Sequence, residues 1–452
     1  MKGRGWRLLA VLLLVVSFGF AACQEKEQEE APAAATPVGE IPPIPAAPEA
    51  PGVTEDKIIL GHHMALTGTL AQLSKVIMPG LVDSPEAFFD YINDHGGVCG
   101  GRKIEWRVVD DQSTAEGALS AVKRLAEVDH VFAFFFNIGE AIHNPRVVEY
   151  LNKNRIPDMY IITGGRYASD RPLDYRFMFR GLTDYYSEGK VIAQFIQEQF
   201  PGKRVALFEV PQYEISTEAS KGAKDSLEGS DNPVVAEVEW SMASFDLTPQ
   251  VMQLRDAHPD IVVGYFSPAT TGMFLDGMEK SGVPLEDWIL IGPSAASDLS
   301  LFEVVGTEKV DKLGGFYAPI FGALDLLWNR DPRFDVYRDI LKQYKPDLKP
   351  DSTYTFWSFT MAILMAETLD RACEKGPLTR EGLVAAAESF KGDFKYIPEE
   401  LKPMMEVAPV ERMGLGPTDH APYGGWVITR AQQGNWSRVS EKTYHVEEET
   451  GD

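Results

Sequence analysis

Apolar and polar positions along the chain follow two alternating patterns, short apolar runs and longer segments with helical spacing. The run at 131–136 is wholly apolar, as is typical of a strand buried on both faces of a sheet. Within 115–126, Ala118, Val122 and Leu125 repeat at the spacing of one helical face. In chain order we predict strands at 57–61, 104–109, 131–136, 159–163, 204–210, 235–240, 260–266 and 288–292. Strands that alternate with helices predict parallel α/β sheets.

Local signals place several helix ends. Ser84 followed by Pro85 predicts a helix that begins there, and the glycine pair at 96–97 predicts its end. The sequence at 113–116, Ser-Thr-Ala-Glu, is a capping-box pattern that opens the next helix. Later in the chain we predict a mostly helical region at 331–390 and strands at 426–429 and 436–439. About ten strands exceed one compact sheet, so we expect two α/β lobes.

The first residues indicate export. Three basic residues within 1–7 precede an apolar run at 8–20, which is shorter than the roughly 20 residues of a membrane span. Ala21 and Ala22 then stand directly before Cys23. This order resembles a bacterial lipobox, whose cysteine is lipidated after cleavage, although an ordinary signal peptide followed by a chance cysteine gives the same pattern. We predict a signal peptide at 1–22 and lipidation of Cys23.

A different composition follows the cysteine. Residues 23–52 contain seven prolines, with alanine and glutamate between them and almost no large apolar side chains. Such a segment buries no core and is typical of a stiff, extended tether. No later apolar run reaches 18 residues, so we expect contact with the membrane through the lipid anchor only, in the periplasm or at the cell surface.

Charge and motifs exclude several classes of function. Acidic residues number 67 and basic residues 43, a formal net charge of -24 that repels phosphate backbones, so nucleic acid is not an expected partner. The chain has no phosphate-binding loop and no nucleophile elbow. We predict no cofactor and no enzyme activity.

Three groups of side chains contain residue types that can carry chemistry. His62 and His63 are neighbours on a strand and point to opposite faces, so they cannot easily hold one metal ion, and we predict no metal site. Asp110-Asp111 fits a strand end that hydrogen-bonds the next helix better than an acid/base pair. Cys99 and Cys373 are inert thiols or one disulfide, and the sequence does not set the distance between them.

The ends of three predicted strands carry the strongest signal for a binding site. In parallel α/β sheets, ligands bind beyond the carboxyl ends of the strands. Here those ends are the segments 63–68, 137–140 and 163–165, each with at least one glycine. Glycine lets a ligand approach backbone N–H groups, but it also simply permits tight turns. The three segments together predict a concave site.

These segments belong to a longer resemblance. Ile59-Leu60-Gly61, Leu66-Thr67-Gly68, the run from Ile92 to Val98, Arg102-Lys103-Ile104 and Asp110-Asp111 are similar to the opening of the type I periplasmic binding proteins, and most similar to their leucine/isoleucine/valine-binding branch, which serves ABC importers. Tyr150-Leu151-Asn152, Thr163-Gly164-Gly165, Asp419-His420 and Gly425-Trp426 continue the pattern. The resemblance spans about 53–439.

The resemblance implies a fold and a division into lobes. It implies two Rossmann-like lobes with parallel central sheets, joined by three hinge strands near 181–186, 319–322 and 414–420. The expected first lobe comprises 53–183 plus 322–416, and the expected second lobe 184–321 plus 417–452. The expected partners are a small-molecule ligand and an ABC permease, and we expect a monomer.

The resemblance also implies ligand-binding positions in the cleft between the lobes. We expect ligand contacts from His63, Leu73, Gly139, Glu140, Thr163, Gly164, Gly165, Tyr213, Thr270 and Tyr317.

Several of these positions depart from the amino-acid binders. Glu140 stands where those proteins hold the ligand carboxylate with Ser or Thr, and it either faces the ligand or points away as a helix-start charge. The stretch 267–271 lacks the acid that holds the ligand ammonium, Leu73 replaces an aromatic residue, and Glu214 replaces the glycine after Tyr213. These departures favour a neutral, cationic or largely apolar ligand over an ordinary amino acid.

Together these features predict a lipid-anchored solute-binding protein without catalytic turnover. A ligand-sensing domain that signals to a partner protein is the alternative, since the fold serves both tasks. An extracytoplasmic hydrolase is a third possibility, which the absence of a nucleophile–base pair in the sequence disfavours.

Overall fold

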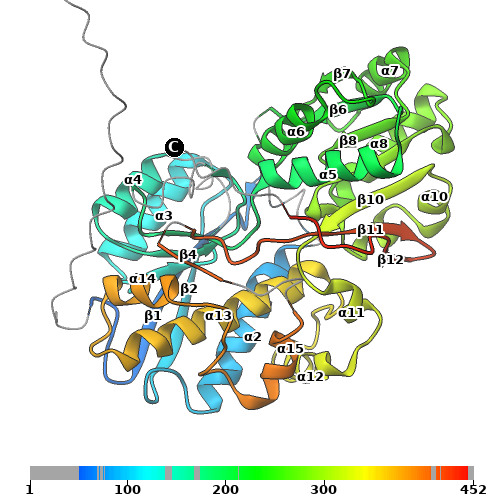
Figure 1. Cartoon of the computed structure of the whole chain (residues 1–452). Helices are drawn as coiled ribbons and strands as arrows, with labels where there is room; N and C mark the ends of the chain where they lie inside the picture. Colours follow the sequence, from blue (N-terminus) through cyan, green and yellow to red (C-terminus); the bar gives the residue numbers. More distant parts are fainter. Residues whose placement is uncertain are drawn as a thin grey trace, which may run out of the picture. The chain divides into compact units, whose positions relative to one another are not determined.

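The computed structural model describes residues 50–68, 71, 75, 77–137, 145–166, 174–211, 213–408, 414–417 and 419–445. These residues lie within one compact unit, Ile44–Asp452. In that unit the strands form two separate sheets, one of five strands and one of seven (Figure 1). Each sheet and the helices packed around it are called a lobe below, and the five-stranded sheet belongs to the first lobe.

The first sheet is parallel throughout its described pairings, in the order β2-β1-β3-β4-β5. Its strands are β1 (Lys57–Met64), β2 (Lys103–Asp110), β3 (Ala133–Phe135), β4 (Asp158–Ile161) and β5 (Met178–Arg180). Because the strands are parallel, all their carboxyl ends reach the same edge of the sheet, which brings the segments after β1, β3 and β4 together.

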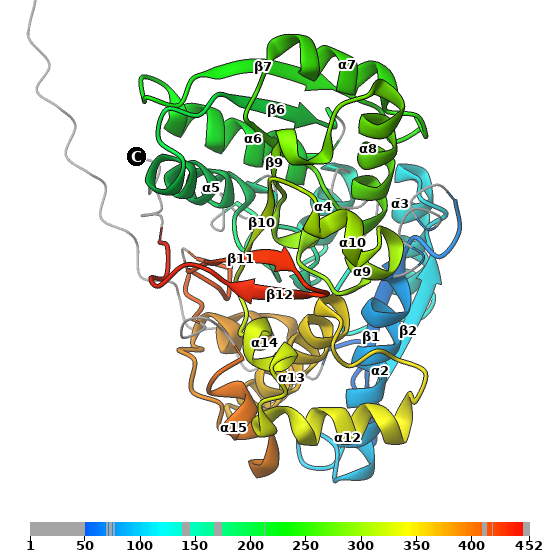
Figure 2. The same cartoon turned by 90° about the vertical axis from the view of Figure 1, so that its right-hand side faces the viewer.

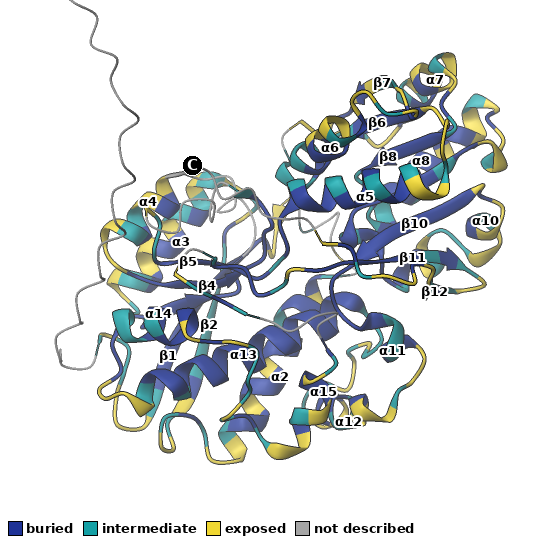
Figure 3. Cartoon of the chain, viewed as in Figure 1, coloured by how far each residue is buried: buried dark blue, intermediate teal, exposed yellow. Residues whose placement is uncertain are grey.

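Helices cover both faces of this sheet. On one face lie α2 (Met78–Asp94) and α13 (Thr353–Glu374), and on the other α3 (Ala115–Glu127) and α4 (Pro145–Lys153). The lobe also contains α12 (Asp335–Tyr344), α14 (Arg380–Glu388) and α15 (Lys402–Met405), with 3-10 turns η5 (Pro332–Phe334) and η6 (Glu399–Leu401), whereas α11 (Leu324–Trp328) contacts the second sheet. Nearly every residue of α13 is buried, as Figure 3 shows. A helix that is apolar all round belongs inside a core, and α13 packs along α2 as the central helix of its lobe.

The second sheet is parallel at its centre and antiparallel at one edge. Its order is β12-β11-β10-β9-β8-β6-β7, and only the β10–β11 and β11–β12 pairings are antiparallel among those described. Its strands are β6 (Val205–Glu209), β7 (Val234–Glu239), β8 (Ile261–Gly264), β9 (Ile289–Ile291), β10 (Gly315–Ile320), β11 (Val427–Gln432) and β12 (Asn435–Arg438). Figure 2 shows β11 and β12 beside β10.

The helices of the second lobe connect these strands. They are α5 (Tyr185–Gln199), α6 (Glu214–Leu227), α7 (Thr248–Ala257), α8 (Pro268–Ser281), α9 (Ser300–Val304) and α10 (Thr307–Asp311), with 3-10 turns η3 (Leu285–Asp287) and η4 (Ser294–Ala296). In the described part of the chain, the path passes between the sheets after β5, after β10 and before β11. The predicted fold, two α/β lobes with parallel central sheets, is confirmed.

Two strands, β5 and β10, have no counterpart among the strands predicted from the hydrophobic pattern. β5 is only three residues long, which is too short for an alternation pattern. β10 is fully buried but reads Gly-Phe-Tyr-Ala-Pro-Ile, and Pro319 argues against a ladder position because it lacks an N–H donor. It is tolerated beside the antiparallel strand β11, opposite Ile428.

The predicted start of the helix at Ser84 is wrong. The helix α2 begins at Met78, with Pro79 in its first turn, and Ser84 and Pro85 lie inside it. The Ser84 hydroxyl donates to the backbone oxygen of Thr355 at 2.7 Å, so this buried serine ties α2 to α13 rather than capping a helix end. A tertiary contact has overridden the local signal.

The predicted capping box at 113–116 is wrong by one residue. The N-cap of α3 is Thr114, whose hydroxyl accepts a hydrogen bond from the backbone N–H of Gly117 at 3.0 Å. Ser113 instead takes a left-handed backbone with φ of 57° and donates its hydroxyl to the backbone oxygen of Thr67 at 2.7 Å. The turn after β1 therefore recruits the serine that local sequence assigns to the helix.

Cys99 and Cys373 form a disulfide, which settles the alternative that the sequence left open. The bond links the turn after α2 to the end of α13, two elements of the first lobe that are 274 residues apart in the chain. A disulfide is compatible with an oxidising compartment outside the cytoplasm.

Candidate ligand-binding site

His63 lies at the end of β1 and is fully buried. Its Nδ1 is 2.9 Å from Oδ2 of Asp111, and its backbone N–H donates to Oδ1 of Asn137 at 2.9 Å. The amide of Asn137 donates in turn to Asp158, whose pKa is raised to about 6 by burial. These buried bonds join the ends of β1, β2, β3 and the start of β4, so His63 holds the sheet edge in shape.

His62 points away from its neighbour, as expected for adjacent strand residues. Its Nδ1 is 3.2 Å from the backbone oxygen of Phe135, and its ring lies 4.7 Å from the ring of Trp106. Burial lowers the pKa of His62 to about 3, so the ring is neutral at physiological pH. Among the described residues, no group of three or more His, Cys, Asp or Glu side chains is placed to hold a metal ion.

The carboxylate of Asp110 organises the turn that follows β1. Asp110 is the last residue of β2, and its Oδ1 accepts the backbone N–H groups of Leu66 and Thr67, both at 3.1 Å. The Thr67 hydroxyl donates to Oδ2 at 2.6 Å. Asp110 and Asp111 therefore end a strand and accept hydrogen bonds from backbone N–H groups of the neighbouring turns. This matches the strand-end interpretation of the pair rather than an acid/base pair.

The segment 163–165 follows β4 and is buried against the second lobe. A Cβ atom on Gly164 would lie 2.0 Å from the backbone oxygen of Thr183 and 2.6 Å from the ring of Tyr185. The N–H of Gly165 donates to the Thr163 hydroxyl at 2.8 Å. Because residue 164 is glycine, the chain at 183–185, where it first crosses between the lobes, can pack directly against the backbone at this position.

Gly165 faces a residue of the second lobe. A Cβ atom on Gly165 would lie 2.3 Å from Oε2 of Glu214, the first residue of α6. The next residue, Arg166, donates its backbone N–H to both carboxylate oxygens of Glu218 on the same helix, at 3.1 and 3.2 Å. The end of β4 in the first lobe therefore meets the start of α6 in the second.

Aromatic side chains line the second-lobe side of this meeting point. The rings of Tyr213, directly before α6, and Tyr265, directly after β8, have centroids 5.4 Å apart and are tilted by 53°. Both residues are half-buried. The buried Thr270 hydroxyl donates to the backbone oxygen of Tyr265 at 3.0 Å as part of the cap of α8, so Thr270 positions this tyrosine.

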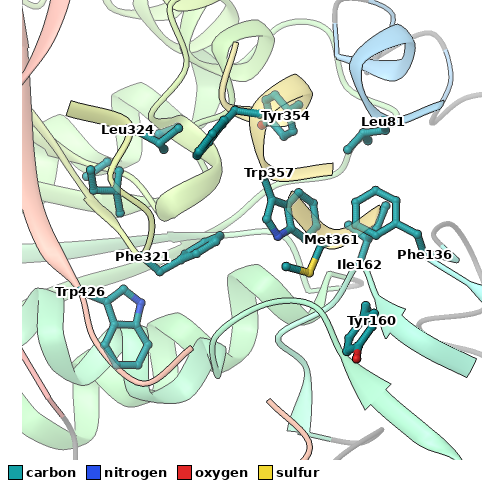
Figure 4. Close-up of a cluster of buried hydrophobic side chains, with 14 of the residues drawn as sticks. Leu81, Phe136, Tyr160, Ile162, Phe321, Leu324, Tyr354, Trp357, Met361 and Trp426 are labelled. Carbon is teal, nitrogen blue, oxygen red and sulfur yellow. The ribbon is translucent and has the colours of Figure 1, made fainter. Parts of the chain in front are cut away.

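The helix α13 brings two further aromatic side chains to the junction of the lobes. The hydroxyl of Tyr354 donates to the backbone oxygen of Ala295 in the second lobe at 2.7 Å. Trp357 donates its ring N–H to the backbone oxygen of Gly181, where the chain first crosses between the lobes, at 3.1 Å. Figure 4 shows Tyr354 and Trp357 in the hydrophobic cluster that also contains Phe321.

Another polar junction between the lobes lies at the start of α13. Asp298, which follows η4 in the second lobe, is buried, and its Oδ2 accepts both the hydroxyl of Ser352 and the backbone N–H of Thr353 at 2.8 Å. Its Oδ1 accepts the N–H of Ser300 at 2.8 Å. A negative charge at a helix N-terminus is favourable, and here the carboxylate comes from the other lobe. A cavity of about 440 Å³ borders this junction.

The structure brings part of the expected site together. Thr163, Gly164, Gly165 and Tyr213 lie at the meeting point of the lobes, whereas Tyr317 packs in the second lobe against Phe195, with ring centroids 5.3 Å apart. Leu73, Gly139, Glu140 and the lipidation candidate Cys23 lie outside the described residues.

The sequence-based prediction of ligand contacts did not include four residues of this region, namely Tyr185, Glu214, Tyr265 and Tyr354. Glu214 had a detectable signal, because it replaces a glycine of the resembling family. Tyr354 had none, because it lies in the apolar helix α13, far along the chain from the other residues of this region, and only folding brings it to them.

No helix among the described residues is both long and apolar enough to cross a membrane.

Comparison with known proteins identifies relatives by family model and by fold. A family model described as "Periplasmic binding protein" matches residues 57–435. Among curated proteins, no sequence matches. A branched-chain amino acid ABC transporter protein from Thermus thermophilus, solved with bound valine, has a TM-score of 0.72 at 16% identity, covering 87% of this chain and 98% of that one.

Two other solved structures are similar over comparable lengths. A fatty acid ABC transporter substrate-binding protein from Thermomonospora curvata has a TM-score of 0.68 at 19% identity, covering 88% of this chain and 95% of that one. A solute-binding protein from Rhodopseudomonas palustris BisB5, in complex with 3,4-dihydroxybenzoic acid, has a TM-score of 0.66 at 17% identity, covering 86% and 98%. At these identities the likeness concerns the fold, and the ligands named differ from one structure to the next.

Proposed function

Because the chain belongs to the periplasmic binding protein family, we propose that it captures a small solute between its two lobes and delivers it to an ABC importer. The observation that carries this proposal is the meeting of the segment after β4 with the start of α6, where Gly165 contacts Glu214 across the lobes. A ligand held there touches both lobes, so its binding energy favours one arrangement of the two.

The expected lobe boundaries and ligand contacts form part of this proposal. The lobes comprise 53–183 plus 322–416 and 184–321 plus 417–452. Of the expected contacts, Thr163, Gly165 and Tyr213 are supported by their position at the meeting point, and Thr270 acts by positioning Tyr265. The proposed cycle contains no chemical step.

The ligand we propose is not an ordinary α-amino acid. The stretch 267–271 offers hydroxyls but no acid for a ligand ammonium, and the Thr270 hydroxyl is already engaged in the cap of α8. Glu214 brings a carboxylate to the opposite side, against Gly165, where a ligand carboxylate would be repelled. A neutral, cationic or apolar solute fits these features better.

We also propose that the mature protein is anchored by lipid at Cys23 and acts outside the cytoplasm. The order of basic residues, apolar run and cysteine supports this, as does the proline-rich segment 23–52. Metabolic labelling with a radioactive fatty acid tests it: the full chain should take up label, and Cys23→Ser should not. Equal labelling of both would contradict the proposal.

The test of solute capture is thermal unfolding of the mature protein, first unfolded and refolded to empty the site, against a panel of metabolites. The panel contains branched-chain amino acids, amides, aromatic acids, fatty acids and amines. A ligand at 100 times its Kd should add about 2.7 kcal/mol to the free energy of unfolding. No shift with any class would contradict solute capture.

Delivery is tested by uptake. Deletion of the gene in the native host should abolish uptake of the labelled ligand, and the chain expressed from a plasmid should restore it. Normal uptake in the deletion strain would instead favour a sensing role.

A further inference from the structure

The third passage of the chain between the lobes is held to a different lobe at each end. The backbone oxygen of His420 accepts the N–H of Arg180 on β5 at 2.9 Å, and its buried ring donates from Nδ1 to the same strand at 2.7 Å. Trp426, directly before β11 of the second lobe, exchanges backbone hydrogen bonds of 3.0 and 2.7 Å with Tyr444. The stretch 421–425 therefore links a point held to the first lobe with a point held to the second.

A cavity of about 530 Å³ lies beside this linking stretch. On one side it is lined by Lys391, which follows α14 of the first lobe, and by residues 414–417. On the other side it is lined by Asp184, the N-cap of α5, and by Trp426. None of its lining residues is among those described above at the meeting of β4 and α6. Because its two sides are held to different lobes, the width of this cavity depends on how the lobes are arranged.

Part of the cavity wall is apolar. Leu415 and Pro422 are buried, and Tyr423 is half-buried. The ring of Tyr423 packs on Phe321, which follows β10 directly, with ring centroids 4.9 Å apart. Phe321 and Trp426 both belong to the hydrophobic cluster of Figure 4. An apolar group in the cavity would cover Tyr423 at the point where the second and third passages between the lobes pack together.

Two charged groups of opposite sign line the cavity, and neither has an ion-pair partner among the described residues. Nζ of Lys391 donates to the backbone oxygen of Leu415. Oδ1 of Asp419 accepts the backbone N–H of Ala421 at 2.9 Å. An ammonium group has three donors and a carboxylate has two acceptor oxygens, so each group can bind a further partner.

The third charged residue of the wall is already paired. Oδ2 of Asp184 accepts a hydrogen bond from Nε of Arg166 at 2.9 Å and one from Arg180 at 3.3 Å. Its other oxygen accepts the backbone N–H of Ser187 in the cap of α5. The cavity therefore offers a ligand one positive group, Lys391, and one negative group.

We propose that this cavity is a second binding site, which takes a small zwitterion with an apolar body, and that its occupancy holds the two lobes in one arrangement. The carboxylate of such a ligand pairs with Lys391, its ammonium group pairs with Asp419, and its body lies on Tyr423. A ligand that contacts groups held to both lobes favours the arrangement in which it fits. This site goes beyond the proposed capture of a solute and does not depend on it.

The first experiment compares probes that differ by one charge at a time. The zwitterion para-(aminomethyl)benzoate carries both charges on an aromatic ring, whereas benzoate lacks the ammonium group and benzylamine lacks the carboxylate. Titration calorimetry with the mature protein should give a Kd for the zwitterion at least about tenfold lower than for either singly charged probe. A zwitterion that does not bind, or binds no better than one of its analogues, would overturn the proposal.

Variants that remove one charge assign the two partners. Lys391→Gln should weaken binding of the zwitterion and of benzoate about tenfold and leave benzylamine unchanged. Asp419→Asn keeps an acceptor for the N–H of Ala421, and it should weaken the zwitterion and benzylamine but not benzoate. Lys395→Gln is the control, because Lys395 is exposed in an ion pair with Asp393, and it should change each Kd less than about twofold.

The outcomes for the two variants decide different parts of the proposal. Binding of the zwitterion that is unchanged in both variants would place it elsewhere and overturn the site. An effect of one variant alone would overturn the zwitterionic class of the ligand.

The effect on the lobes is measured with one spin label on each. Val128, after α3 of the first lobe, is 70% exposed, and Phe245, after β7 of the second, is 66% exposed. Both are changed to cysteine in a chain that carries Cys23→Ser and keeps its disulfide. Saturation with para-(aminomethyl)benzoate should narrow the distribution of distances between the labels, as measured by pulsed electron paramagnetic resonance. An unchanged distribution would overturn the effect on the lobes.

Failure of this proposal differs from failure of solute capture. If the zwitterion does not bind while the metabolite panel shifts the unfolding temperature, solute capture stands and the second site is wrong. If the zwitterion binds in a Lys391-dependent manner while no compound of the panel shifts the unfolding temperature, the second site stands and solute capture is contradicted.

Discussion

The two junctions between the lobes differ in how their polar groups are used. At the start of α13, the buried carboxylate of Asp298 accepts hydrogen bonds from Ser300, Ser352 and Thr353 within 2.8 Å. At the end of β4, Glu214, Tyr213 and Tyr265 are half-buried. The first junction resembles the interior of a folded domain, while the second leaves polar surface that a solute can cover.

This difference in burial indicates that the junction at Asp298 supports stability, whereas the junction at the end of β4 governs ligand recognition. A buried carboxylate with several partners contributes to stability, because its removal leaves buried donors unpaired. Half-buried side chains cost little to change, but they decide what can bind. Tyr354 links the two junctions, since its hydroxyl is bonded to Ala295 near Asp298 while its ring belongs to the other site.

The largest effect on stability is expected at the first junction. Asp298→Ala should lower the free energy of unfolding by about 3 to 4 kcal/mol, because the N–H groups of Ser300 and Thr353 would stay buried without a partner. Urea unfolding followed by tryptophan fluorescence measures this. Asp276→Asn, an exposed acid of α8, is the control and should change it by less than about 0.5 kcal/mol. Equal effects of the two would remove the distinction between the junctions.

The next effect depends on pH and concerns Glu188 of α5, whose buried carboxylate accepts the backbone N–H of Ser294 at 3.0 Å. Burial raises its pKa from 4.5 to about 7, so the folded state keeps a proton that the unfolded state loses in this range. Stability should therefore fall as the pH rises from 4.5 to 7, by on the order of 3 kcal/mol from this group. Glu188→Gln has no such proton and should become more stable relative to the original chain across the same range. Parallel pH profiles of the two proteins would contradict this assignment.

Adjacent glycines should respond differently to the same substitution. Gly164→Ala places a methyl group against the backbone oxygen of Thr183 and should cost about 2 kcal/mol of stability. Gly165→Ala meets only the end of the Glu214 side chain, which can rotate away, so its cost should stay below about 1 kcal/mol. It should nevertheless weaken binding of the captured solute, because the methyl group displaces the Glu214 side chain at the meeting point of the lobes. Thermal unfolding and calorimetry on both variants separate the two effects.

The smallest expected effect is at the residue shared by both junctions. Tyr354→Phe removes one hydrogen bond to Ala295 and keeps the ring, so it should cost about 1 kcal/mol of stability. Binding of the captured solute should change less than about twofold, because the ring is retained. A large loss of binding would mean that the hydroxyl, rather than the ring, contacts the ligand.

The sequence determined the architecture because hydrophobic periodicity is a local property. Eight predicted strands, from 57–61 to 288–292, each overlap a strand of the structure, and the two lobes follow from their number. The helix α3 packs on the face that Ala118, Val122 and Leu125 predicted. The order of the motifs along the chain also indicated the family, because comparing that order requires no knowledge of distances in the fold.

Tertiary structure alone decided the bonding partner of a side chain where a distant residue offers an alternative to the local one. Ser84 and Ser113 carry helix-start signals, yet contacts with Thr355 and Thr67 draw them elsewhere. The pairing of Cys99 with Cys373 and the approach of Glu214 to Gly165 also depend on segments far apart in the chain. Local pattern determines which element forms, because it depends on neighbouring residues, whereas the partner of a polar side chain is decided only when the packed elements bring the alternatives within hydrogen-bonding distance.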